Sequence, residues 1–122
     1  MPIASPIASP VAHDVTLHVR RAIVMLMADG RGSPDIELVA AAIGISVRTL
    51  QRRLHRIGTT YAGVARQVRC DAALRMLKNP ERRIGEVART LGYADHPHFT
   101  RAFHRWTGLT PREFRRRMTP EP

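Results

Sequence analysis

Apolar residues recur at helical spacing from the first third of the chain onward. The first series, at intervals of four, four and three residues, consists of Val15, Val19, Ile23 and Leu26. Such spacing places the series on one side of an α-helix, which the glycine-containing stretch 29–32 is expected to end. No segment alternates polar and apolar residues with the period of two that is typical of a half-buried strand. The sequence therefore predicts an all-α fold.

Two shorter helices are expected next, separated by a turn. The second helix has clear boundary signals in SPDIELVAAAIG, with Ser33 expected as N-cap and Pro34 as the first helical residue. Gly44 marks its end. Ser46 can cap the third helix, expected over residues 47–57.

A longer helix and three further helices complete the pattern. The long helix is expected over residues 61–78, with one apolar stripe formed by Tyr61, Val64, Val68, Ala72 and Met76. Asn79 and Pro80 end it. Shorter helices are expected over 84–91 and from just after Asp95 to about residue 107, and a capping box from Thr110 to Glu113 opens the last helix.

Two stretches of the chain repeat each other. The segment IELVAAAIG at residue 36 matches IGEVARTLG at residue 84, an offset of 48, and TLQRRLHRI at residue 49 matches HFTRAFHRW at residue 98, an offset of 49. In the second pair, one helix face carries Leu50, Leu54 and Ile57, matched by Phe99, Phe103 and Trp106. The polar residues Arg52, His55 and Arg56 are matched by Arg101, His104 and Arg105, and Arg56 and Arg105 lie to the side of the outward face.

Each repeat has the sequence pattern of a helix-turn-helix. Ala40 and Ala88 allow a close helix crossing, and Gly44 and Gly92 can adopt the positive φ of the turn. One such pattern also fits many simple helical hairpins. Two copies with basic outer faces favour a pair of DNA-binding motifs.

The charge of the chain indicates a polyanionic partner. Its 122 residues carry a formal net charge of +10, with 20 Lys and Arg against 10 Asp and Glu, and Lys78 is the only lysine. This imbalance favours nucleic acid first and an anionic membrane surface second. Arginine binds phosphate or a guanine edge with two donors, although a GC-rich genome also raises arginine content.

Residues 14–118 resemble the DNA-binding domain of the AraC/XylS family of transcription regulators. The most specific match is IGEVARTLGYADHPHFTRAFHRWTGLTPREFR, residues 84–115. The resemblance implies seven helices in two helix-turn-helix subdomains, about 34–58 and 84–107, joined by the linker helix 61–78. It assigns the recognition helices to residues 47–57 and 96–107, within a domain that spans 14–122. Pro97 departs from the small polar residue that the family often has at that position.

Helix length makes this arrangement suitable for DNA. A linker helix of about 18 residues is roughly 27 Å long, so subdomains at its ends could place two outer faces about one DNA turn apart, roughly 34 Å. One chain could then reach two successive major grooves. Because the two outer faces differ, the DNA site is expected to be asymmetric.

The outward polar residues of both repeats are the candidate DNA contacts. Arg and Gln suit guanine and adenine edges, and the expected base contacts are Arg48, Gln51, Arg52, His96, Thr100 and Arg101. Contacts to phosphate are expected from Ser46, Arg56, Thr60 and Arg105, which lie at helix starts or to the side of the outward faces. For the expected base contacts of the first repeat, the alternative is contact with phosphate or simple solvation.

Other chemistry has little support in the sequence. The single cysteine, Cys70, excludes an internal disulfide framework and a multi-cysteine zinc site, and the pair His96 and His98 lacks further ligands, so no metal or cofactor is expected. No nucleophile with its activating base is recognisable, so an enzyme is not expected. No membrane span or signal peptide is evident, and a cytoplasmic, nucleoid-associated protein is expected. Residues 1–13, with the IASP repeat, are expected to be a disordered tail or linker remnant.

The leading hypothesis is a sequence-specific regulator that binds double-stranded promoter DNA. The alternative is a non-specific nucleic-acid-packaging protein that uses the same charge, and two different recognition helices favour the regulator. The resemblance further implies contact with RNA polymerase. It also allows for an effector or dimerisation domain upstream of this chain.

Overall fold

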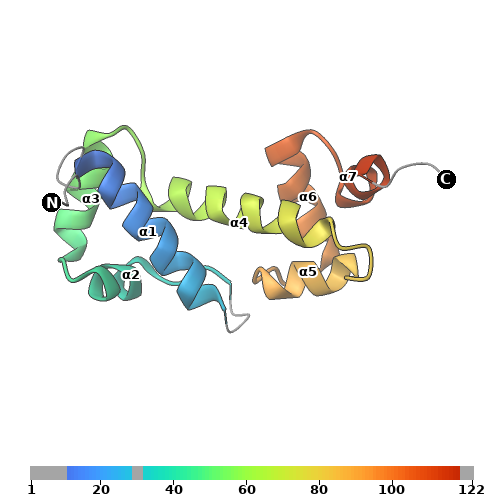
Figure 1. Cartoon of the computed structure of the whole chain (residues 1–122), viewed down its shortest axis with the longest axis horizontal. Helices are drawn as coiled ribbons and strands as arrows, with labels where there is room; N and C mark the ends of the chain where they lie inside the picture. The colour runs from blue at the N-terminus through green and yellow to red at the C-terminus, as the bar shows by residue number, and fades with distance from the viewer. Residues whose placement is uncertain (1–10, 29–31, 119–122) are drawn as a thin grey trace, which may run out of the picture. The chain divides into compact units, whose positions relative to one another are not determined.

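The computed structural model describes residues 11–28 and 32–118, with side chains from residue 15 onward. Within these ranges it has seven helices and no strands (Figure 1). They are α1 (Val11–Met27), α2 (Ile36–Ile43), α3 (Val47–Arg56), α4 (Tyr61–Leu77), α5 (Ile84–Thr90), α6 (His96–Thr107) and α7 (Pro111–Met118). The predicted all-α fold is confirmed.

The predicted tail and first turn are only partly described. Residues 1–10 of the expected tail and residues 29–31 of the expected helix-ending stretch lie outside the described residues. Residues 11–13, which were assigned to the tail, instead belong to α1. The prediction placed the helix start at the first apolar series, but the helical backbone begins four residues before Val15.

The chain divides into two compact units. The first comprises the described residues of Met1–Leu26 and Pro34–Val68, and the second those of Met27–Ser33 and Arg69–Pro122. Helix α4 therefore contributes its N-terminal half to the first unit and its C-terminal half to the second. Each unit contains one of the two predicted helix-turn-helix motifs.

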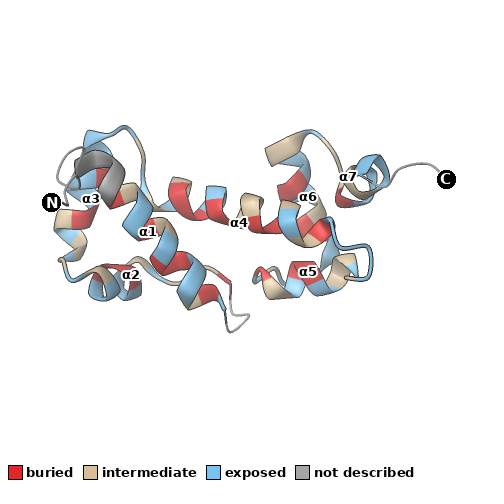
Figure 2. Ribbon diagram, in the orientation of Figure 1, coloured by how far each residue is buried: buried red, intermediate tan, exposed pale blue. Residues whose placement is uncertain are grey.

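The first unit has an aliphatic core. Its buried residues come from one face of each helix, as Figure 2 shows, and include Val19, Ile23, Val39, Leu50, Leu54, Val64 and Val68. Leu50 and Leu54 are four residues apart on α3, so they lie on one helix face, as predicted. Ile57 was expected on the same face, but α3 ends at Arg56 and Ile57 follows as its C-cap with 37% of its surface exposed.

The second unit has an aromatic core. Phe99 and Phe103 of α6 are both fully buried, with ring centroids 5.8 Å apart, and Phe103 also lies 5.8 Å from Phe114 of α7. Val87 and Leu91 add aliphatic surface from α5 and the residue that ends it. The heavier side chains of the second repeat thus occupy the positions that leucines occupy in the first.

The start of α2 differs from the prediction. The N-cap is Asp35, and the helix begins at Ile36 rather than Pro34. The carbonyl oxygen of Asp35 accepts the N–H groups of Leu38 and Val39 at 3.0 and 3.3 Å. Ser33, the predicted N-cap, instead uses its hydroxyl oxygen to accept a hydrogen bond from the Arg69 guanidinium at 2.7 Å.

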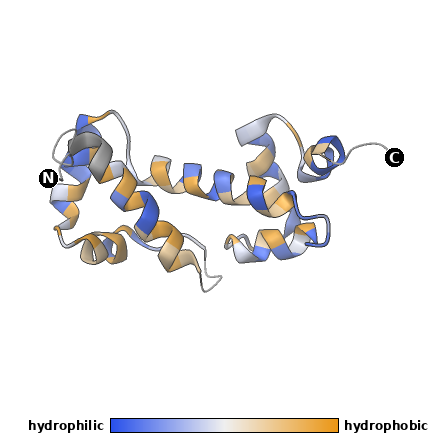
Figure 3. Ribbon diagram, viewed as in Figure 1, coloured by the Kyte–Doolittle hydropathy of each residue, from blue (hydrophilic) through white to orange (hydrophobic). Residues whose placement is uncertain are grey.

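Two helices differ from the pattern of one buried apolar stripe. Helix α4 buries residues beside its stripe, and α2 exposes an apolar residue. On α4, Val64, Val68 and Ala72 are buried as expected, but Ala65 and Ala73 beside that stripe are buried too. Helix α2 is apolar around most of its surface, as Figure 3 shows. Its Leu38 is consequently 55% exposed, because only one side of this short helix faces the core.

Candidate nucleic-acid interface

The two predicted recognition helices, α3 and α6, begin with the same local structure. The Ser46 hydroxyl oxygen accepts the Thr49 N–H at 3.1 Å at the start of α3, as predicted from the sequence. At the equivalent position of α6, the Asp95 carboxylate accepts the His98 N–H at 2.9 Å. This backbone hydrogen bond, with a smaller contribution from the His98 side chain, lowers the pKa of Asp95 below its ordinary value. Each cap satisfies an N–H group that the first helical turn leaves free and so fixes where the recognition helix starts.

The two helix-turn-helix turns also match. Gly44 and Gly92 have φ values of 91° and 89°, a region that strongly favours glycine. The Ala40 carbonyl oxygen accepts the Ile45 N–H at 3.1 Å, and the Ala88 carbonyl oxygen accepts the Tyr93 N–H at 3.0 Å. Ala40 and Ala88 are 2% and 1% exposed, which fits the close helix crossing expected for them.

The repeat extends further than the sequence comparison indicated. The Thr60 hydroxyl oxygen accepts the Gly63 N–H at 3.0 Å at the start of α4, and the Thr110 hydroxyl oxygen accepts the Glu113 N–H at 3.1 Å at the start of α7. These pairs are related by an offset of 50 residues, from 60 to 110 and from 63 to 113. The signal was present in the sequence as GTT against GLT, but a register change of one residue after the recognition helices hid it.

The predicted capping box of α7 is confirmed. The Thr110 N–H donates to the Glu113 carboxylate at 2.9 Å, which completes the reciprocal pair of hydrogen bonds. The same N–H is the main reason that the pKa of Glu113 lies below its ordinary value. Arg115, two residues further, donates to the carbonyl oxygens of Leu77 and Asn79, so it stabilises the end of α4.

The predicted contact residues lie on the solvent side of their helices. All are exposed except Thr100, which is half-buried: the exposed ones are Ser46, Arg48, Gln51, Arg52, Arg56, Thr60, His96, Arg101 and Arg105. Neither α3 nor α6 contains an Asp or Glu residue. Within α3 and α6 themselves the outward faces therefore combine cationic and hydrogen-bonding side chains, and the exposed Asp95 carboxylate caps the start of α6 just outside the helix.

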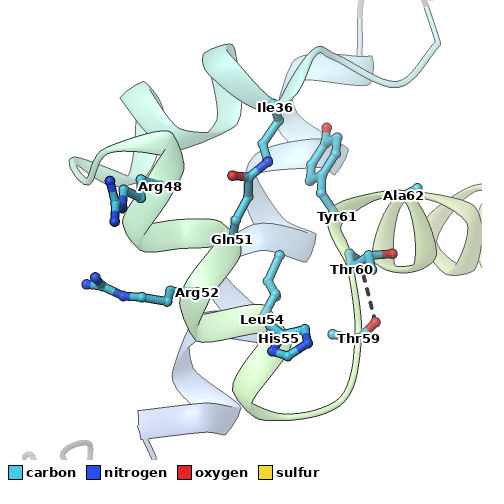
Figure 4. Close-up of a pocket in the computed structure, with 10 residues that line it drawn as sticks. All are labelled: Ile36, Arg48, Gln51, Arg52, Leu54, His55, Thr59, Thr60, Tyr61 and Ala62. Atoms are coloured by element: carbon cyan, nitrogen blue, oxygen red, sulfur yellow. Dashed lines mark hydrogen bonds between the residues drawn. The ribbon is translucent and has the colours of Figure 1, made fainter.

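An open groove of about 720 Å³ lies beside α3 in the first unit (Figure 4). Its lining includes three of the predicted base contacts, and the full set is Ile36, Arg48, Gln51, Arg52, Leu54, His55, Thr59, Thr60, Tyr61 and Ala62. In Figure 4, Arg48 and Arg52 extend to one side of α3, whereas Gln51 extends toward the side of Ile36 and Tyr61. Ser46 does not line the groove.

Three polar residues of this groove were not among the predicted contacts. His55 is exposed on α3, Thr59 lies in the turn before α4, and Tyr61 is the first residue of α4. The Tyr61 hydroxyl donates to the Pro34 carbonyl oxygen, which joins the beginning of α4 to the residues before α2. The residue pattern of α3 does not reveal Thr59 and Tyr61, because they reach the groove from the next element.

Other kinds of site receive little support from the described residues. No group of three or more His, Cys, Asp or Glu side chains within them is arranged to hold a metal ion. No helix in this part of the chain is long and apolar enough to cross a membrane. Partial burial, followed by the nearby Asp71 charge, raises the pKa of the Cys70 thiol and makes it less reactive.

Comparison with known proteins identifies the family. A family model described as a helix-turn-helix domain matches residues 39–117. A transcriptional regulator from Chromobacterium violaceum, described as containing an AraC-type DNA-binding domain, has the same fold: the TM-score is 0.74 and the identity 21%, over 90% of this chain and 99% of that one. The ornithine utilization regulator of Pseudomonas aeruginosa is 38% identical over 91 residues, which are 75% of this chain and 27% of that protein. The chain belongs to the AraC/XylS family of transcription regulators.

This membership confirms several predictions. The seven helices are those of an AraC-type DNA-binding domain, and the relatives are regulators, so the expectation that the chain is not an enzyme is confirmed. The same fold occurs in the DNA-binding domain of AdpA, solved in complex with a target DNA, with a TM-score of 0.65 and 23% identity over 81% of this chain and 90% of that one. The packaging alternative finds no support among these relatives. The chain spans about a quarter of the length of the curated relatives that it matches.

Proposed function

We propose that this AraC-type domain binds double-stranded promoter DNA by inserting α3 and α6 into successive major grooves, and that it regulates transcription in this way. The observation that carries the proposal is that α3 and α6 begin with the same backbone geometry but carry different residues on their outward faces. Both helices start with a side-chain cap and follow a positive-φ glycine turn. Arg48 and Gln51 of α3, however, correspond to Pro97 and Thr100 of α6 at the offset of 49. Two equal scaffolds with different surfaces suit the reading of two different base sequences.

Arg52 and Arg101 are the proposed principal base contacts. They occupy equivalent positions, both are exposed, and both lie opposite the fully buried pairs of their helices. Arginine can donate two hydrogen bonds to the O6 and N7 atoms of guanine. Secondary base contacts are proposed for Arg48, Gln51, His96 and Thr100.

Arg56 and Arg105 are proposed to contact phosphate. Each lies four residues beyond the principal arginine, near the C-terminal end of its recognition helix. Ser46 and Thr60 are proposed to act through the N–H groups at the helix starts, because the first N–H groups of a helix have no partner within the helix and suit an anion. Contacts of this kind position the protein on the duplex and are independent of base sequence.

The wider setting is proposed from the family. We place the protein in the cytoplasm in association with the nucleoid, and we propose RNA polymerase as a partner at the promoter. An effector or dimerisation domain upstream of this domain fits the greater length of the relatives.

The roles of the arginines can be tested by substitution. Arg52→Ala or Arg101→Ala should lower affinity for a selected site by about 1 to 3 kcal/mol and relax the preference at one or two base pairs. Arg56→Ala or Arg105→Ala should weaken binding to selected and random duplexes alike and reduce the slope of log affinity against log salt by about one. Fluorescence anisotropy with both duplexes at several salt concentrations measures these effects. The proposal fails if all four variants lower the affinity for every duplex equally.

A further inference from the structure

The Arg69 side chain makes an organised set of contacts in the second unit. Its Nε atom donates to the Tyr93 hydroxyl oxygen at 3.2 Å, and its Nη1 atom donates to the Ser33 hydroxyl oxygen at 2.7 Å. Its guanidinium carbon also lies 6.0 Å from the centroid of the Tyr93 ring. A guanidinium is planar and rigid, so two such hydrogen bonds fix the positions of both acceptors relative to α4.

Tyr93 connects this cluster to the recognition helix of the second unit. Its ring centroid lies 5.6 Å from that of Phe99 and 6.2 Å from that of Trp106, both on α6. Phe99 is fully buried, so its position is coupled to that of α6 as a whole. A hydrogen bond to the Tyr93 hydroxyl therefore acts on the orientation of α6.

The backbone around this cluster is closely packed. Gly32 has a φ of 85° and lies against the turn between α5 and α6. A Cβ atom added at Gly32 would be 2.8 Å from Gly92 Cα and 3.1 Å from the Leu91 carbonyl oxygen. The segment that carries Ser33 thus has little freedom to move relative to the turn that carries Tyr93.

The first unit lacks a counterpart of this hydroxyl. Ile45 is equivalent to Tyr93, since both N–H groups donate to the carbonyl oxygen of the crossing alanine in their motif. An isoleucine cannot accept a hydrogen bond from a guanidinium. Among the described residues, the arrangement is therefore a feature of the second helix-turn-helix.

We propose that Arg69 is a positioning residue for DNA recognition by the second unit. Together with Ser33 and Tyr93 it fixes the orientation of α6 and so directs Arg101 toward its base pairs. Arg69 is half-buried and its guanidinium donates to two side chains within the protein, so its role is separate from contact with phosphate. The inference rests on the proposed sequence-specific binding and adds a specificity determinant that itself does not contact DNA.

The test compares base preferences at the two halves of a selected DNA site. Arg52→Ala and Arg101→Ala first identify the base pairs that depend on α3 and on α6. Tyr93→Phe keeps the ring and removes only the hydroxyl, and Arg69→Lys keeps the charge but loses the planar pair of donors. Arg75→Gln is the matched control, because Arg75 is an exposed arginine on the same helix and in the same unit.

Tyr93→Phe and Arg69→Lys, the two clamp variants, should each reduce the preference at the α6-dependent base pairs by about three- to tenfold, because each of them loses a hydrogen bond that involves a charged group. The preference at the α3-dependent base pairs should stay unchanged, and Arg75→Gln should alter neither. Binding is measured well below the melting temperature of each variant, which thermal unfolding determines first. The fluorescence of Trp106, the single tryptophan, should also change in the clamp variants, because its ring lies beside Tyr93.

Three results would overturn the inference. If Arg69→Lys kept the full base preference, the positive charge of Arg69 rather than its planar pair of donors would be responsible. If the variants lost affinity equally for every duplex, Arg69 would be a phosphate contact. Lower melting temperatures with unchanged preferences in both clamp variants would assign it a purely structural role. A wild-type domain without any base preference would instead refute the proposed function, and the inference with it.

Discussion

The assignment of the faces of α3 can be tested with two leucine-to-alanine substitutions. Leu54 on α3 is fully buried, whereas Leu38 on α2 is 55% exposed, and both belong to the first unit. The same three carbon atoms are removed in each case. Any difference in the free energy of unfolding therefore reports the difference in burial.

The expected costs follow from the structure. At Leu54, the loss of three buried carbons costs about 2.4 kcal/mol in transfer free energy at about 0.8 kcal/mol each, and the cavity left behind raises the total to about 3 to 5 kcal/mol. At Leu38, less than half of the surface is buried and solvent fills the vacated space, so the cost is about 1 kcal/mol. The two variants should differ by at least about 2 kcal/mol.

Urea unfolding followed by circular dichroism at 222 nm measures both variants against the wild type. Leu54→Ala should shift the midpoint strongly to lower urea and weaken DNA binding only where the protein has begun to unfold. Leu38→Ala should unfold nearly as the wild type does. Wild-type stability of Leu54→Ala together with lost DNA binding would show that the faces of α3 are assigned wrongly, because Leu54 would then lie on the DNA-binding face.

Two further predictions concern the second unit. Gly32→Ala should destabilise the fold by about 1 to 3 kcal/mol because of the positive φ at this residue, and the contact of the new Cβ atom with Gly92 adds a further cost. Gly85 lies in a helix with open space around it, so Gly85→Ala should be neutral or stabilising by up to about 1 kcal/mol. Thermal unfolding measures both variants. Acid should weaken the cap of α6, because the His98 N–H lowers the pKa of the Asp95 carboxylate in the folded protein. The stabilisation that this cap gives the fold is complete above the unfolded pKa of about 3.9 and is lost as the pH falls through the lower folded pKa. Asp95→Asn keeps a capping oxygen that does not titrate in this range, so its melting temperature should fall less between about pH 5 and pH 2.5, and an equal fall would contradict the prediction.

The features that the sequence predicted correctly are local ones. The spacing of Leu50 and Leu54 identified the buried face of α3, and Ser46 was recognised as a cap because its partner, the Thr49 N–H, lies three residues away. The repeat was visible because both motifs need a small residue at the crossing and glycine in the turn. Such requirements act over one or two helical turns, so the sequence records them directly.

The features that were not predicted from the sequence depend on contacts between residues far apart in the chain. Ser33 resembled an N-cap, but its hydroxyl is bound by Arg69, 36 residues away, and the helix starts later. The groove beside α3 is completed by Thr59 and Tyr61, which no pattern within α3 reveals. Leu38 belongs to a helix that is apolar at most positions, and only the packing of α2 shows that this residue is largely exposed.

We propose that one chain reads an asymmetric DNA site with two different helices, α3 and α6. The decisive experiment is the selection of bound duplexes from a random pool by the isolated domain, followed by sequencing. We expect one consensus with two unlike blocks, centred about one helical turn of DNA apart and bound by a single chain. A palindromic consensus that requires two chains, or the absence of any consensus, would contradict it.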